Sequence, residues 1–193
     1  MIFGIVVEAE RDAVVYSTLI RRIRTDVDNV LCRPCQGVAG VRSKFIGWLK
    51  HFQWHSGHFV GKALVIRDSD CHDSRATEDE LTQILDKSGF QTELTFPVHF
   101  YATRCMVETW LLADEGAVNT VARQRGKSSS ARPFTGPLEV PMDAKTPFRQ
   151  MLSQAHLPAD PAVYGAAAAA ADMERIQQRC PYFKRFIDCV NGC

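Results

Sequence analysis

The chain has 193 residues, of which 46% are hydrophobic and 23% are charged, and its formal net charge is +1. This length and balance predict a folded globular domain and exclude a disordered chain. No run approaches the ~18 apolar residues that span a bilayer, and the first residues lack the pattern of a secretory signal. We therefore expect a cytoplasmic protein with no membrane partner.

The seven cysteines are an odd number and are spread along the chain. A secreted disulfide scaffold is denser in cysteine and even in count, so reduced thiols are expected. Cys32 and Cys35 form a Cys-x-x-Cys motif, but a zinc site needs four ligands and no second such motif follows. A redox motif of the thioredoxin kind opens a helix, whereas Cys32 should lie inside a strand. We interpret the pair as a strand cysteine followed by a turn cysteine.

Strand and helix patterns alternate over the first 115 residues or so. Apolar runs of strand length occupy Ile2–Val7, 30–32, 63–66 and 92–98, the last continuing toward Tyr101. Apolar positions recur at helical spacing over 12–23, 41–53 and 78–88. Thr77 begins a capping box for the third of these helices and Gly89 terminates it.

Parallel strands joined by crossover helices need helices on both faces of the sheet. The sequence therefore predicts an α/β fold, a three-layer sandwich with a mostly parallel sheet of four to five strands. This domain should cover residues 1–123. Residues 124–146, rich in Ser, Pro, Gly and basic side chains, are expected to form a basic loop or linker. Prolines 147, 161 and 181 mark helix starts, so residues 147–193 should be a helical extension packed on the same domain.

Two acidic stretches follow predicted strands, at residues 8–12 and 68–73. Ligands of an open α/β sheet collect at the carboxyl ends of its strands, so Glu8, Asp68 and Asp70 should converge there. Carboxylate oxygens suit Mg²⁺ or Mn²⁺ and not zinc. Glu10 and Asp73 are outer candidates for the same metal site.

Charge along the chain is basic, then acidic, then basic. An acidic centre that holds cations, flanked by basic side chains, suits a phosphate-backbone substrate. The candidate nucleic-acid contacts are Arg21, Arg22, Arg42 and Lys44. The alternative is that these charges belong to solvated helix faces.

These motifs resemble a known family. Glu8 after a strand, Asp12 four residues later, and Asp68-x-Asp70 after a strand about sixty residues on are similar to the Toprim domain of topoisomerases, primases and overcoming-lysogenization-defect nucleases. The chain more closely resembles small stand-alone Toprim-like proteins that accompany ATPases in bacterial defence loci. Residues 107–114 are similar to their Glu-x-Trp-Leu-Leu-Ala-Asp signature, and residues 180–186 to their tail.

The resemblance implies a Toprim- or Rossmann-like fold and a Mg²⁺- or Mn²⁺-dependent nuclease that acts on DNA or RNA. Glu8 would be the general acid or base, and Asp68 and Asp70 the metal ligands. Glu108 would bind a second metal or orient a neighbour. The implied partners are a nucleic acid, an ATPase and a second copy of the chain in a homo-oligomer.

One departure keeps another function open. Toprim domains usually have glycine after the motif glutamate, and here the residue is Ala9, which takes a positive φ less cheaply. The alternative is a non-catalytic regulatory or assembly module that retains an acidic cation-binding pocket. A phosphoacceptor receiver domain fits less well. It has an acidic pair after the first strand and a single aspartate after the third, whereas here the acidic pair lies on the wrong strand. The chain has no Gly-x-x-x-x-Gly-Lys-Ser/Thr loop and so does not supply its own NTPase.

Two other groups have structural interpretations. Glu108 could be the exposed position of an amphipathic helix that buries Trp110 and Leu111. The three histidines of residues 51–58 are interpreted as surface side chains at a helix end and loop, not as metal ligands.

Overall fold

The computed structural model describes residues 1–57 and 59–192. A four-stranded sheet in the order β2-β1-β3-β4 lies at its centre. The strands are β1 (Ile2–Val7), β2 (Asn29–Pro34), β3 (Val60–Asp68) and β4 (Val98–Thr103), and all three pairings are parallel. The predicted α/β fold with a mostly parallel sheet is confirmed, with four strands.

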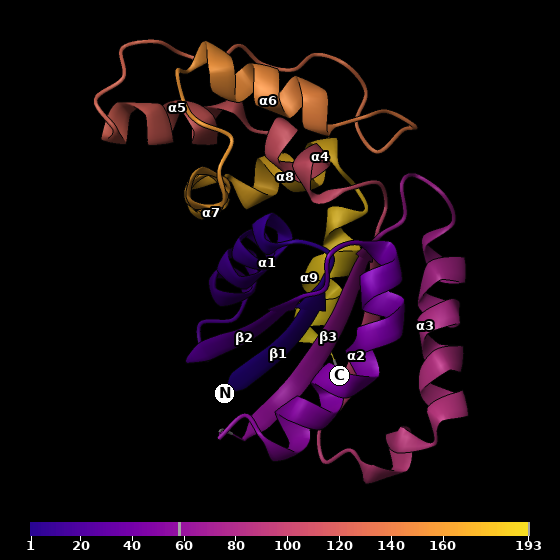
Figure 1. Cartoon of the computed structure of the whole chain (residues 1–193). Helices are drawn as coiled ribbons and strands as arrows, with labels where there is room; N and C mark the ends of the chain where they lie inside the picture. Colours follow the sequence, from indigo (N-terminus) through magenta and orange to yellow (C-terminus); the bar gives the residue numbers. More distant parts are fainter. Residues whose placement is uncertain (58, 193) are drawn as a thin grey trace.

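Helices cover both faces of this sheet (Figure 1). One face packs against α1 (Glu10–Ile23) and α9 (Phe183–Asn191), and the other against α2 (Val38–Trp54) and α3 (Ser74–Ser88). Alternate residues of β3 supply the two cores: Leu64 and Ile66 face the first, whereas Ala63 and Val65 face the second. A strand buried on both faces is apolar throughout, which explains the unbroken apolar runs.

The remaining helices form a lobe beyond the carboxyl edge of the sheet, at the top of Figure 1. They are α4 (Val107–Leu112), α5 (Glu115–Gln124), α6 (Lys145–Gln154), α7 (Pro161–Ala170) and α8 (Met173–Arg179). Helix α7 packs on α1 and α5, and α6 packs on α4. The apolar core continues from the sheet into this lobe, where Trp110 contacts the rings of Tyr16 and Phe183. The helical lobe therefore lies over the strand ends where the acidic residues were expected.

The starts of α3 and β4 differ most from the predictions. Asp73, not Thr77, caps α3, because its carboxylate accepts a hydrogen bond from the Arg75 backbone N–H at 2.9 Å. The fourth strand was predicted at 92–98 but begins at Val98, after a 3-10 helix, η1 (Phe90–Glu93). Pro97 has no N–H to donate to a sheet, so the strand starts beyond it.

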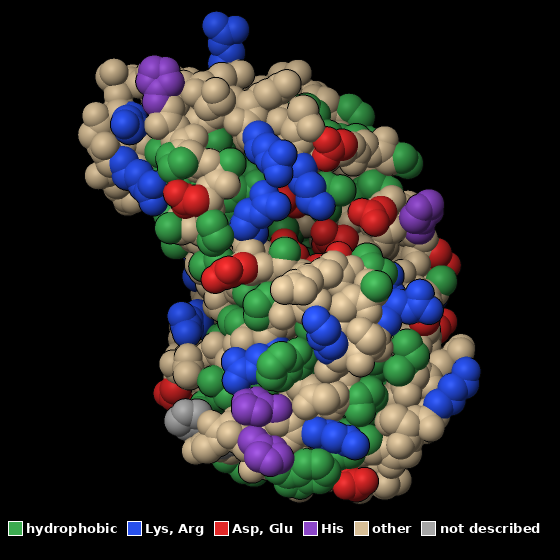
Figure 2. All heavy atoms as spheres, viewed as in Figure 1, with side chains coloured by type: hydrophobic (Ala, Val, Ile, Leu, Met, Phe, Trp, Pro, Cys, Tyr) green, Lys and Arg blue, Asp and Glu red, His purple; other side chains and the backbone are tan. Residues whose placement is uncertain are grey.

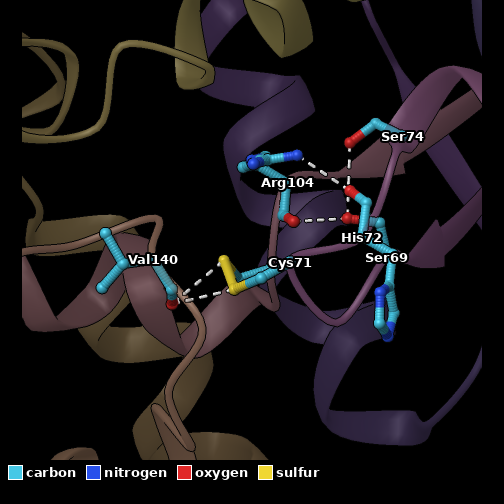
Figure 3. The surroundings of a disulfide bond; sticks show 7 residues. Ser69, Cys71, His72, Ser74, Arg104 and Val140 are labelled. Carbon is cyan, nitrogen blue, oxygen red and sulfur yellow. Dashed lines mark hydrogen bonds between the residues drawn. A yellow bond between two sulfur atoms is a disulfide. The ribbon is translucent and has the colours of Figure 1, made fainter.

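The expectation of reduced thiols is wrong for Cys71 and Cys105, which form a disulfide (Figure 3). Asp68 pairs with Thr103 in neighbouring parallel strands, so the segments that leave both strands run side by side and bring the sulfurs together. Both sulfurs lie against the Val140 carbonyl oxygen, at 2.9 and 3.6 Å. A disulfide sulfur carries no hydrogen, so these are sulfur–oxygen contacts.

Cys32 lies within β2 and the buried Cys35 follows its end, as predicted for a strand and a turn cysteine. Of the helices in the described ranges, none has both the length and the apolar character that crossing a membrane requires.

Candidate functional site

Glu8 and Asp68 meet at the carboxyl edge of the sheet. Strand β1 ends at Val7 and its neighbour β3 ends at Asp68, so the two acidic residues leave adjacent strands side by side. The Glu8 Oε1 atom accepts a hydrogen bond from the Asp68 backbone N–H at 3.0 Å. This contact holds the Glu8 carboxylate beside the end of β3.

Two further carboxylates join this pair. Asp12, in the first turn of α1, accepts a hydrogen bond from the Ala9 backbone N–H at 2.9 Å. Glu108, on α4, is only 1% exposed, and its Oε2 atom has no hydrogen-bond partner among the described residues. We call Glu8, Asp12, Asp68 and Glu108 the carboxylate cluster.

Burial and mutual repulsion raise the pKa values of the cluster. Burial raises the pKa of Asp68 well above its usual range, and the charges of Asp12, Glu8 and Glu108 add to the effect. Burial, followed by repulsion from Glu108, raises the pKa of Asp12 to about 6. Burial also raises the pKa values of Glu8 and Glu108. Ionising all four carboxylates together is therefore unfavourable unless a positive charge compensates them.

Basic side chains act electrostatically on this cluster. Lys145, the first residue of α6, lowers the pKa of all four carboxylates, and Arg11 and Arg149 lower that of Glu108. Figure 2 shows the hollow between the sheet and the helical lobe, with Asp and Glu side chains at its floor and Lys and Arg side chains on the lobe above. Lys145 and Arg149 could not be predicted as part of the site, because only the packing of α6 on α4 brings them near the carboxylate cluster.

Asp70, Asp73 and Glu10 lie outside the carboxylate cluster. Asp70 is exposed, with φ of 47°, and its backbone N–H donates to the Cys105 carbonyl oxygen at 3.1 Å. Its charge still reaches Glu8, whose pKa it raises. Asp73 uses its carboxylate to cap α3. Glu10 is exposed beside Glu8, at the rim of a surface pocket of about 450 Å³.

Ala9 needs no glycine-like conformation. It is the N-cap of α1 with φ of −137°, an extended conformation that any residue adopts. The left-handed positions of the neighbouring loop are instead Gln36 and Gly37. Alanine after the motif glutamate therefore does not strain the turn that presents Glu8.

The basic residues expected at the substrate lie in different places. Arg21 is eleven residues beyond Glu10, about 17 Å along α1 and away from the strand ends. Arg22 donates to the Ala168 carbonyl oxygen at 2.8 Å. Arg42 forms a 2.5 Å ion pair with Glu80, and Lys44 is exposed on α2. The structure does not bring Arg21 and Arg22 to the carboxylate cluster.

The donor set of the cluster fits a hard cation. All its ligand atoms are oxygens, one of them buried without a partner, and the repulsion among the carboxylates is what a divalent cation would relieve. In the positions that the side chains occupy here, no three His, Cys, Asp or Glu residues of the described chain are close enough together to hold a metal ion. Binding would therefore require side-chain rotation within the cluster.

Comparisons of the chain with protein-family models, with curated proteins and with solved structures found no match. The chemistry of the site is therefore argued from its own residues.

Proposed function

We propose that the protein is a Mg²⁺- or Mn²⁺-dependent phosphodiesterase, a nuclease that acts on DNA or RNA. The observation that carries this proposal is the buried Glu108 Oε2 atom. It has no hydrogen-bond partner in the described part of the chain, and its carboxylate raises the pKa values of both Asp12 and Asp68. A buried carboxylate beside other carboxylates is costly unless a cation compensates it.

Glu8, Asp68 and Glu108 would hold the cation, with Asp70 as an outer ligand. When bound, the cation would supply Lewis-acid stabilisation of the charge on a phosphate group. Asp12, whose pKa is about 6, is suited to holding and releasing a proton near neutral pH. Glu8 keeps one oxygen on the Asp68 backbone N–H, which fixes its orientation for proton transfer by the other.

Basic side chains that act on the carboxylate cluster would bind the substrate. Lys145 and Arg149 project from α6, and Arg11 from the start of α1. Their charges act on the carboxylate cluster, so a phosphate bound to them would lie next to the cation. This arrangement favours a polyanionic substrate placed between the sheet and the helical lobe.

The wider assignments are part of this proposal. Acidic residues at the ends of β1 and β3 support a Toprim-like protein, and with it a cytoplasmic setting, an ATPase partner and a homo-oligomer. The disulfide is evidence against a cytoplasmic setting, because cytosolic thiols are usually kept reduced.

A non-catalytic module that retains an acidic pocket is the second candidate. It is favoured by one observation: no three candidate ligands among the described residues lie close enough together to hold a metal ion. The two candidates differ in whether a metal-dependent reaction occurs, which the following experiment measures.

The test is cleavage of plasmid DNA, single-stranded DNA and transfer RNA by the purified chain in Mg²⁺ or Mn²⁺, with EDTA as a control. The variants are Asp68→Asn and Glu108→Gln, which keep side-chain shape and remove charge. Asp79→Asn, an exposed change on α3, is the matched control. We expect cleavage to fall about 100-fold or more in the two cluster variants and to persist in the control. Metal-dependent cleavage that persists in both cluster variants would refute the assigned site. No cleavage of any substrate would favour the non-catalytic module.

A further inference from the structure

A second hollow lies beside the carboxyl edge, next to the disulfide-linked segments that follow β3 and β4. It has a volume of about 220 Å³ and is formed by the start of α3, the segment after β4 and the start of α9. Its lining residues are Asp73, Ser74, Arg75, Arg104, Tyr182 and Arg185. Three arginines from distant parts of the sequence therefore meet at one small cavity that the carboxylate cluster does not use.

One of the three guanidinium groups is already neutralised. Arg185 donates to both carboxylate oxygens of Glu78, at 2.9 and 3.2 Å. Glu78 in turn accepts a hydrogen bond from the Ala102 backbone N–H at 2.9 Å. This pair fixes one wall of the hollow but adds little net charge to it.

Arg104 and Arg75 carry the excess positive charge. Arg104 donates to the His72 carbonyl oxygen at 2.8 Å (Figure 3), and its guanidinium lies 5.3 Å from the centre of the Tyr182 ring. Its Nε atom is buried and has no hydrogen-bond partner among the residues described. Within that same part of the chain, neither Arg104 nor the exposed Arg75 has an ion pair.

Two carboxylates lie near these arginines, and both have other contacts. The Asp73 carboxylate lines the hollow and accepts the Arg75 backbone N–H as the cap of α3. Glu139 accepts the Tyr182 backbone N–H at 3.1 Å, and Arg104 lowers its pKa. Glu139 is not among the residues that line the hollow, so with Arg185 paired to Glu78 the lining presents two guanidinium groups and one carboxylate. The hollow therefore suits an anion.

The charge of the hollow suits a phosphate monoester. Such a group carries between one and two negative charges at neutral pH and offers three strong acceptor oxygens, whereas a phosphate inside a strand carries only one charge. Guanidinium groups bind phosphate through paired N–H donors, and the half-exposed Tyr182 ring offers a surface on which a sugar or base can stack. Two guanidinium groups therefore favour the more highly charged phosphate at a strand end over the singly charged phosphates within the strand.

We propose that this hollow binds the terminal phosphate of a nucleic-acid strand. This inference rests on the proposed function, because it names the part of the substrate that the protein recognises. Asp73 is five residues beyond Asp68, so the backbones of the hollow and the carboxylate cluster are at most about 17 Å apart. A strand held by its end in the hollow would reach the carboxylate cluster within a few nucleotides, so cleavage would fall near that end.

The test measures binding of three labelled single-stranded oligonucleotides of one sequence, with a 5′-phosphate, a 3′-phosphate or hydroxyl groups at both ends. Fluorescence anisotropy is recorded in EDTA, so the result does not depend on metal or on cleavage. The variants are Arg75→Glu, an exposed change that leaves the fold intact, and Arg104→Gln. Lys87→Gln, an exposed change at the other end of α3, is the control for loss of one charge.

We expect one phosphorylated end to bind about tenfold more tightly than the hydroxyl end. Both arginine variants should remove this preference, whereas Lys87→Gln should retain it, and the 5′ and 3′ arms show which end is bound. Equal binding of all three oligonucleotides, or a preference that survives both arginine variants, would overturn the inference. If the protein prefers a phosphorylated end but shows no metal-dependent cleavage, the inference about the hollow stands and the proposed nuclease activity is refuted.

Discussion

Asp12 shows how one side chain serves both the fold and the candidate site. Its carboxylate caps α1 through the Ala9 backbone N–H and also belongs to the carboxylate cluster. The cap orients the carboxylate toward Glu108, and the resulting repulsion, added to burial, raises its pKa to about 6. The unfolded chain has no such neighbours, so an aspartate there titrates near pH 3.9.

This difference predicts a pH-dependent stability. Between pH 4 and 6 the unfolded state releases the Asp12 proton that the folded state retains, so stability falls as pH rises through this range and stays lower above it. Asp12→Asn keeps the capping oxygen and removes the charge. We expect the variant to be about 1–2 kcal/mol more stable than wild type at pH 7.5 and nearly equal to it at pH 4. Urea unfolding at both pH values measures this, and a variant less stable at pH 7.5 would contradict it.

Asp68 and Asp70 should differ as metal ligands although they are two residues apart. Asp68 belongs to the carboxylate cluster, whereas Asp70 is exposed at its margin. Because a ligand that binds only the folded state stabilises it, 10 mM Mg²⁺ should raise the Tm of wild type by about 3–8 °C. Asp68→Asn should abolish this shift and Asp70→Asn should retain most of it. The measurement is thermal unfolding with Mg²⁺ and with EDTA, and equal loss in both variants would place Asp70 in the first coordination sphere.

At the scale of elements, the disulfide joins the two segments that carry the acidic residues. Cys71 follows Asp68 and Asp70, and Cys105 precedes Glu108 on α4. The bond therefore ties the end of β3 to the start of the helical lobe. It also lies against Val140, in the segment between α5 and α6.

Loss of this bond should destabilise the protein measurably. The two cysteines are 34 residues apart, and closing a loop of that length restricts the unfolded chain by about 3–4 kcal/mol. We expect dithiothreitol to lower the unfolding free energy of wild type by about 3 kcal/mol and to leave Cys71→Ser unchanged. Urea unfolding with and without the reductant tests this. Alkylation of both thiols in the folded, unreduced protein would show that the bond is absent.

At the scale of the whole molecule, the hollow of the candidate site exists because two parts of the chain face each other. The sheet and α1 contribute Glu8, Asp12 and Asp68, and the helical lobe contributes Glu108, Lys145 and Arg149. Packing of α7 on α1 and of α4 on α6 holds the lobe in place. A substrate between the two parts would contact both signs of charge.

Lys145 should therefore contribute to nucleic-acid binding more than Arg21 does. Each phosphate contact that is lost reduces the slope of log affinity against log salt by about 0.9. We expect Lys145→Gln to weaken binding and reduce that slope by about this amount, and Arg21→Gln to change neither. Anisotropy titrations from 50 to 300 mM salt in EDTA provide the measurement. The reverse result would place the substrate on the exposed end of α1.

Much of the fold could be predicted from local patterns. Apolar runs located β1 and β3 and the acidic residues at their ends, because a strand buried on both faces is apolar throughout and ends where polar residues begin. Local patterns failed where two signals competed. Asp73 and Thr77 were both possible caps of α3. Near β4, the apolar run predicted a strand from residue 92, whereas Pro97 indicated a start after residue 97.

The sequence by itself determined the α/β class, the parallel strands and the presence of carboxylates at two strand ends, since these follow from periodicity and from the chain direction of each strand. Only the tertiary structure decided that Glu108 is buried, that Lys145 acts on all four carboxylates and that Cys71 meets Cys105. Those features depend on which segments pack together across long separations in the chain. Packing of that kind is set by the summed burial of many apolar side chains and not by any single motif.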